Sequence, residues 1–140
     1  QMLSFEPPDW RPLLGATGEP TLGGTLATNL SGPRRLRAGA ARDFFLGFSA
    51  VNGRGELFKA GGKVVKNVTG YDLPKLAAGS FGTLFAMTEL TLRAVPRGAT
   101  TAVLALEGKD PADALRVLRA VAAAPFEPSI TTSAQTELLS

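Results

Sequence analysis

The amino-acid sequence predicts a mixed fold in which short helices alternate with strands. A β-hairpin is indicated because two runs of aromatic and branched residues flank the turn at Asn52-Gly53. Helix starts are indicated where a capping side chain precedes an apolar run, at Thr21, Asp72 and Asp110. Hydrophobic residues make up 44% of the 140 residues, which is typical of a globular protein. We therefore expect one domain, or one and a fraction.

The elements follow one another at short intervals. Pro7, Pro8 and Pro12 are expected to exclude regular structure at the start of the chain. Gly79 is expected to end the second helix, and Pro96 the last strand. The elements expected in this part are a helix over Leu22–Asn29, strands over Phe44–Val51 and Glu56–Lys59, a helix over Asp72–Ala78 and a strand over Thr83–Val95.

Gly98 is the best candidate for a domain boundary, because the residue pattern of the sequence changes after it. A helix begins at Asp110, with Pro111 at its first position and a carboxylate in its first turn. Its apolar face is expected to cover a sheet and consists of Leu115, Val117, Leu118, Val121 and Ala122. A strand is expected over Thr101–Leu106 before this helix, and Glu127–Thr132 is expected to lead into another strand after it.

Cysteine and histidine do not occur in the sequence. This excludes disulfides, thiolate zinc sites and cysteine-held iron–sulfur clusters within the chain. It also excludes a histidine general base and a cofactor attached covalently through either residue. No apolar run approaches the roughly 20 residues that span a bilayer, and no leader segment is visible. A cytoplasmic location is the default expectation, and we expect the chain to be a piece of a longer protein.

The net charge is +3, and several of the 15 basic residues gather in one stretch. These are Arg34, Arg35, Arg37 and Arg42. The stretch contains no interleaved aromatic residues on which nucleic-acid bases could stack, so nucleic-acid binding is disfavoured. Two interpretations stay open: a solvated loop, or a contact to a cofactor phosphate or a partner subunit.

The most informative stretch is Thr21–Gly32, in which adjacent glycines lie at a predicted helix start. Glycine lets a backbone approach a ligand without an intervening Cβ atom. The unpaired N–H groups of a helix start suit an anionic or electron-rich cofactor. The spacing is neither that of a Rossmann turn nor that of a phosphate-binding P-loop.

Five motifs in a fixed order resemble the vanillyl-alcohol oxidase (PCMH-type) flavoprotein superfamily. Within it, the sequence is most similar to the FAD-binding subunits of bacterial glycolate oxidases. The motifs are Thr21–Gly32, Gly39–Gly47, the Asn52-Gly53 hairpin, Lys63–Leu73 and Gly79–Leu84. The resemblance is dense over residues 1–98 and looser over 99–140.

The resemblance implies an α+β fold. Residues 1–98 would form the second half of a PCMH-type FAD-binding domain, an antiparallel sheet flanked by helices. Residues 99–140 would begin the α+β cap that shapes the substrate site. The first FAD subdomain, which normally holds most of the pyrophosphate, would be absent from this chain.

The resemblance also implies a set of residues that contact non-covalently bound FAD. In the glycine-rich stretch these are Thr21, Gly23, Gly24, Thr28 and Gly32. Further contacts are expected from Arg34 and from the backbone of Ala86 or Met87. Phe85 departs from the family pattern, which usually has glycine there. Catalytic residues are not identified.

A polar loop precedes the second predicted helix and contains Lys63, Lys66, Asn67, Tyr71 and Asp72. In one interpretation Asp72 caps that helix and the lysines are solvated. In the other, a lysine near the flavin stabilises the negative charge that develops on reduction.

The implied function is the FAD-binding component of an oxidoreductase that acts on a small 2-hydroxy acid such as glycolate. Its expected partners are the catalytic flavoprotein and iron–sulfur subunits of a glycolate-oxidase-like complex, with membrane association only through them. No nucleic acid, metal or membrane-spanning segment is expected. The alternative is a cofactor-free docking module of a multi-subunit flavin oxidase.

Overall fold

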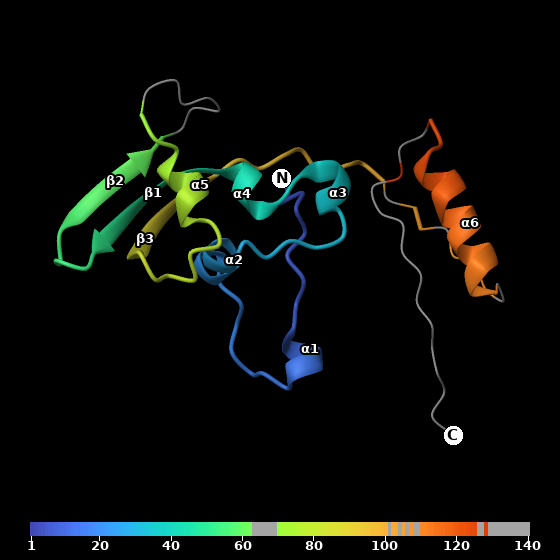
Figure 1. The fold of residues 1–140 in the computed structure, drawn as a ribbon, viewed down its shortest axis with the longest axis horizontal. Helices are drawn as coiled ribbons and strands as arrows, with labels where there is room; N and C mark the ends of the chain where they lie inside the picture. The colour runs from blue at the N-terminus through green and yellow to red at the C-terminus, as the bar shows by residue number, and fades with distance from the viewer. Residues whose placement is uncertain are drawn as a thin grey trace. The chain divides into compact units, whose positions relative to one another are not determined.

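A computed structural model of the chain describes residues 1–62, 70–100, 102, 103, 105, 107, 110–125 and 128. The chain divides into two compact units, Gln1–Pro96 and Arg97–Ser140. Each unit is described by itself (Figure 1).

The first unit is built on a three-stranded antiparallel sheet with the order β2-β1-β3. Short helices flank the sheet, so the predicted α+β class is confirmed. Helix α5 lies against β1 and β2, α4 contacts α5, and α2 contacts α4 (Figure 1). The elements are α1 (Arg11–Leu14), α2 (Leu22–Thr28), α3 (Arg35–Ala38), α4 (Ala41–Phe44), β1 (Phe45–Asn52), β2 (Leu57–Gly61), α5 (Leu73–Ala77) and β3 (Phe85–Leu92).

The predicted hairpin is confirmed, and Asn52 organises its turn. The Asn52 carbonyl accepts a hydrogen bond from the Gly55 N–H at 3.0 Å, and Gly55 has the positive φ of 79° that the turn requires. The Asn52 side-chain oxygen accepts hydrogen bonds from the N–H groups of Arg54 and Glu56 at 2.9 and 3.0 Å. One asparagine therefore satisfies most of the turn's backbone donors.

Strand β3 is shorter than the predicted range Thr83–Val95. Its pairing with β1 shifts register between Ser49 and Ala50, and it ends at Leu92. Val95 instead forms an isolated antiparallel bridge with Met2, through backbone hydrogen bonds of 2.9 and 3.1 Å. The start of the chain is thus tied to the segment that follows β3.

The prolines near the start do not exclude all regular structure, contrary to the prediction. Pro12 lies in the first turn of the four-residue helix α1, where its missing N–H would have no partner in any case. Phe5 is fully buried, and its ring centroid lies 5.5 Å from that of Phe44. The N-terminal segment therefore contributes to the core.

The core is small and largely aromatic. Phe48 on β1 packs against Phe58 on β2 and Phe85 on β3, with ring centroids 5.8 and 4.9 Å away. Phe85 stacks on Phe48 at an interplanar angle of 15° and meets Phe58 edge-on. The residue that departs from the family pattern is therefore a packing residue of the sheet. The buried hydrophobic residues are Phe5, Leu26, Ala41, Phe44, Phe45, Phe48, Ala50 and Ala77.

The second unit contains α6 (Pro111–Ala122), whose predicted cap is confirmed. The Asp110 side chain accepts a hydrogen bond from the Ala112 N–H at 3.1 Å, and Asp113 pairs with Arg116 on the next turn. Within the described residues, α6 has no buried side chain, and Leu115 is 50% exposed. The predicted strand over 127–132 lies outside the described residues except for Pro128. In the strand predicted over 101–106, residues 101, 104 and 106 also lie outside, and the others form no strand.

Replacing Phe85 with alanine should destabilise the first unit by about 2 kcal/mol. The estimate combines the burial of part of a phenylalanine with the loss of two ring contacts. Urea unfolding followed by circular dichroism measures this change, and Phe85→Leu, which keeps most of the apolar volume, should recover much of it. An unchanged midpoint for Phe85→Ala would contradict the packing role.

Candidate functional site

The glycine-rich stretch forms α2, and Thr21 is its N-cap as predicted. The Thr21 hydroxyl oxygen accepts a hydrogen bond from the Gly24 N–H at 3.0 Å. The Thr21 carbonyl accepts hydrogen bonds from both the N–H and the hydroxyl of Thr25, each at 3.0 Å. Leu26 is fully buried on the inner side of the helix.

Three of the predicted site residues share the exposed side of α2. Thr21, Gly24 and Thr28 are all exposed, at the spacing that places residues on one helical face. The Thr28 hydroxyl donates to the Gly24 carbonyl at 2.8 Å, so its oxygen is left to act as an acceptor. The face offers backbone atoms and hydroxyl oxygens rather than charged side chains.

Gly23 and Gly24 differ in the space that a side chain would have at each position. A Cβ atom at Gly24 would lie 3.2 Å from the Thr21 hydroxyl oxygen, which is a tight contact with the cap. A Cβ atom at Gly23 would lie 4.0 Å from that oxygen and would meet nothing closer among the described residues. Glycine within a helix is less stable than alanine by about 0.5–1 kcal/mol. Packing inside the described chain does not explain why position 23 is glycine.

Gly32, also predicted as a cofactor contact, is explained by packing within the chain. A Cβ atom at Gly32 would lie 2.3 Å from the Glu6 carbonyl oxygen. The Gly32 N–H donates to the carbonyls of Phe5 and Glu6 at 3.0 and 2.9 Å. Only glycine fits at this close approach of two backbones.

Asn29 and Ser31 hold the helix pair α2–α4 together, a role that the sequence analysis did not assign. Asn29 ends α2 in the left-handed conformation, with φ 54°. Its side-chain oxygen accepts a hydrogen bond from the Arg42 N–H at 3.0 Å, and the Ser31 hydroxyl accepts one from the Ala41 N–H at 2.8 Å. Both residues cap the start of α4. The local signal was an asparagine at a helix end, but its partner ten or more residues away was not readable from sequence.

The end of α2 is also bound to the segment that leads into β3. The carbonyls of Leu26 and Ala27 accept hydrogen bonds from the N–H groups of Gly79 and Phe81, at 3.1 and 2.8 Å. The Leu26 carbonyl also accepts the Asn29 N–H at 3.0 Å, whereas the Ala27 carbonyl is one of those that a helix end leaves without a partner inside the helix. The two predicted groups of site residues, on α2 and on β3, are thereby linked through the segment 79–81.

The predicted β3 residues lie opposite β1. Ala86 pairs with Val51 and is exposed, whereas Met87 pairs with Ala50 and packs partly against the core. Of these two side chains, that of Ala86 is exposed and could contact another molecule, whereas that of Met87 is half-buried.

Arg34 is half-buried, and its Nε atom is buried without a hydrogen-bond partner among the described residues. Buried N–H donors are usually paired, so an acceptor from outside the described chain is the natural complement. Arg93 has the same feature, although its guanidinium lies 4.7 Å from the centroid of the Phe44 ring, a favourable cation–π position.

In the polar loop, Asp72 is confirmed as a helix cap. Its side chain accepts a hydrogen bond from the Lys75 N–H at 3.3 Å, and it pairs with the Lys75 ammonium at 3.3 Å. Tyr71 is 91% exposed. Lys63, Lys66 and Asn67 lie outside the described residues.

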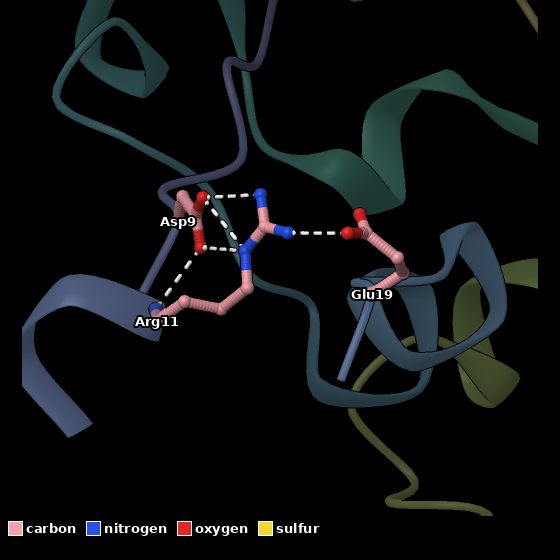
Figure 2. A network of polar contacts seen from close by, with 3 residues as sticks. All are labelled: Asp9, Arg11 and Glu19. Carbon is pink, nitrogen blue, oxygen red and sulfur yellow. Dashed lines mark hydrogen bonds and ion pairs between the residues drawn. The ribbon is translucent and has the colours of Figure 1, made fainter. Parts of the chain in front are cut away.

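A charged network precedes α2 and was not singled out in the sequence. The Arg11 guanidinium pairs with both carboxylate oxygens of Asp9, at 2.7–3.0 Å, and with Glu19 at 2.7 Å (Figure 2). The hydrogen bonds from Arg11 lower the pKa of Asp9 from its usual value, and the same bonds raise the pKa of Arg11.

The part of the chain that the structure describes contains neither a helix that could span a membrane nor a cluster of side chains that could hold a metal ion. None of its helices is long and apolar enough to cross a membrane. No group of three or more acidic side chains in that part is arranged to hold a metal ion.

Several proteins of known name are similar to this chain, although no protein-family model matches it. The glycolate oxidase subunit GlcE of Escherichia coli is 44% identical over 97 residues, which are 69% of this chain and 26% of that protein. The D-lactate dehydrogenase of Archaeoglobus fulgidus is 39% identical over 102 residues, 73% of this chain and 23% of that protein. An uncharacterised FAD-linked oxidoreductase of Mycobacterium tuberculosis is 43% identical over 77 residues, 55% of this chain and 17% of that protein.

These relatives confirm the resemblance to FAD-linked oxidoreductases of the glycolate oxidase kind. The chain spans about a quarter of the length of the first two, GlcE and the D-lactate dehydrogenase. It is a homologue of one segment of such proteins.

Asn29→Gly should destabilise the first unit by a few tenths of a kcal/mol, the usual effect of replacing a capping side chain with glycine. Glycine keeps the left-handed backbone but removes the acceptor for the Arg42 N–H. Asn29→Asp keeps the acceptor and serves as the matched control. Thermal unfolding of the three proteins tests this, and equal stability of Asn29→Gly and the wild type would show that the cap has no energetic role.

Proposed function

We propose that this chain, a homologue of one segment of FAD-linked oxidoreductases, is the FAD-binding component of an enzyme that oxidises a small 2-hydroxy acid such as glycolate. The observation that carries the proposal is the 44% identity with a glycolate oxidase subunit over 97 residues. The similarity to a D-lactate dehydrogenase supports the same substrate class.

In this proposal residues 1–98 are the second half of a PCMH-type FAD-binding domain, and 99–140 begin the cap domain. The division of the chain into units at Pro96 and Arg97 supports a boundary near Gly98. The sheet with α2, α4 and α5 beside it would form the wall on which the cofactor lies.

The exposed face of α2 fits a flavin or its linker. The open space at Gly23 allows a ligand to approach the backbone, and the oxygens of Thr21 and Thr28 can accept hydrogen bonds from it. The unpaired Nε of Arg34 suits an acceptor such as a phosphate oxygen. Ala86 and Met87 complete the proposed contacts, whereas Gly32 serves the site by holding the N-terminal segment in place.

The chemistry of oxidation would come from the flavin, which accepts the hydride equivalent. The residues of this chain would bind and orient FAD and exclude water from it. We propose that FAD is bound non-covalently, and a bond through histidine or cysteine of this chain is excluded because it has neither. For the same reason, the group that takes the proton of the substrate hydroxyl is not a histidine of this chain.

The proposed partners are the catalytic flavoprotein and iron–sulfur subunits of a glycolate-oxidase-like complex, to which electrons would pass. The relative from Escherichia coli is named as a subunit, which supports an assembly. In this proposal the chain is cytoplasmic and reaches a membrane only through its partners.

A cofactor-free docking module is the second candidate. It is favoured by the small share, 26%, of the glycolate oxidase subunit that the chain spans.

Titration of the chain with FAD separates the two candidates. Flavin fluorescence should change saturably, and the melting temperature should rise, since a ligand at 100 times its Kd stabilises by about 2.7 kcal/mol. No saturation and no thermal shift at millimolar FAD would contradict FAD binding by this chain and favour the docking module.

Gly23→Ala should weaken FAD binding at least tenfold without destabilising the free chain. Alanine fits the empty space at position 23 and should raise helix stability by up to about 1 kcal/mol. Gly53→Ala is the control, because Gly53 lies in the hairpin turn and a Cβ atom there meets nothing within 4 Å. Paired FAD titrations and thermal melts measure both effects, and wild-type affinity in Gly23→Ala would remove this glycine from the site.

A further inference from the structure

The guanidinium of Arg11 bridges the beginning and the end of the segment that leads into α2. Arg11 contacts Asp9 on the outgoing side of the segment and Glu19 on the returning side (Figure 2). Glu19 precedes Thr21, the N-cap of α2, by only one intervening residue, Pro20. The ring of Pro20 restricts the backbone between the ion pair and the cap.

Apart from this network, the segment between Glu6 and Thr21 has few attachments to the first unit. Residues 12–20 are all exposed. The backbone N–H groups of Leu13 and Leu14 in α1 donate to the Trp10 carbonyl, and the Arg11 N–H donates to the Asp9 side chain, so these bonds stay within the segment. The nearest anchors are the buried Phe5 on one side and Thr25 on the other.

The geometry of the network suits a clamp. The Arg11 Nε and one terminal nitrogen engage the Asp9 carboxylate side by side, at 2.7–3.0 Å, which orients the guanidinium plane. The other terminal nitrogen then meets Glu19 at 2.7 Å. Lysine could not make both contacts in this way, because it lacks the planar fork.

We infer that Arg11 is a positioning residue: its pair with Glu19 fixes the chain that enters α2 and so holds the Thr21 cap and the glycine-rich face in register for FAD. The inference rests on the proposed function for its link to the cofactor. Because the network is exposed, the clamp weakens as salt screens its charges.

Trp10 provides a direct probe of the clamp. It is the only tryptophan in the sequence, it is 47% exposed, and it adjoins Arg11. Glu19→Gln removes the contact across the segment and keeps the pair between Arg11 and Asp9. Glu107→Gln, on an exposed residue of the second unit, makes the same change in charge and is the matched control.

The test combines Trp10 fluorescence anisotropy, amide hydrogen exchange at Gly24 and Thr25, and FAD titration of the 140-residue chain. Glu19→Gln and Arg11→Lys should lower the anisotropy, speed exchange at both amides about two- to fivefold and weaken FAD binding by a similar factor, as expected for the loss of an exposed ion pair. Glu107→Gln should match the wild type. Raising salt should reproduce the changes in anisotropy and exchange in the wild type and should change both less in Glu19→Gln.

Wild-type anisotropy and exchange in Glu19→Gln would overturn the clamp. Faster exchange with unchanged FAD affinity would overturn its role in positioning the cofactor. If the wild-type chain does not bind FAD, the proposed function fails for this chain, and the link from the clamp to a cofactor fails with it. The anisotropy and exchange results would still decide whether Arg11 fixes the start of α2.

Discussion

The structure of the first unit depends on how the end of α2 is held. Its last carbonyls receive the N–H groups of Gly79 and Phe81, and Asn29, which follows them, caps the start of α4. Three segments far apart in the sequence therefore converge on one helix end. Helix ends normally leave polar groups unpaired, and here those groups are used to join α2 to α4 and to the approach to β3.

The C-terminal end of α2 is bound to the rest of the first unit, whereas its N-terminal end is exposed. The proposed function depends on this difference. The C-terminal end is fixed by backbone bonds and by the buried side chain of Leu26. The N-terminal end is exposed, with space beside Gly23 that the described chain does not fill. A binding face works best when a rigid element supports it. In our account the fixed end and the Arg11 network provide that support from both sides.

The sequence predicted those features whose causes are local. The caps at Thr21, Asp72 and Asp110 and the hairpin turn at Asn52 depend on neighbours within a few residues, and all four are present. The roles of Gly32 and Asn29 depend on Glu6 and Arg42, so their motif was recognised while their packing was not. In the sequence, Phe85 was only a departure from the glycine usual in the family. Its contact with Phe48 depends on how the strands pair, which the sequence does not show.

The most direct test of the central claim is to map which backbone amides of the chain respond to FAD by NMR. We expect the largest chemical-shift changes at residues 21–24, with smaller ones at Thr28, Ala86 and Met87. Gly32 should change little, because its N–H is bound to the carbonyls of Phe5 and Glu6. Saturable shifts confined to other parts of the chain, or to the second unit, would contradict the claim that the exposed face of α2 is a flavin site.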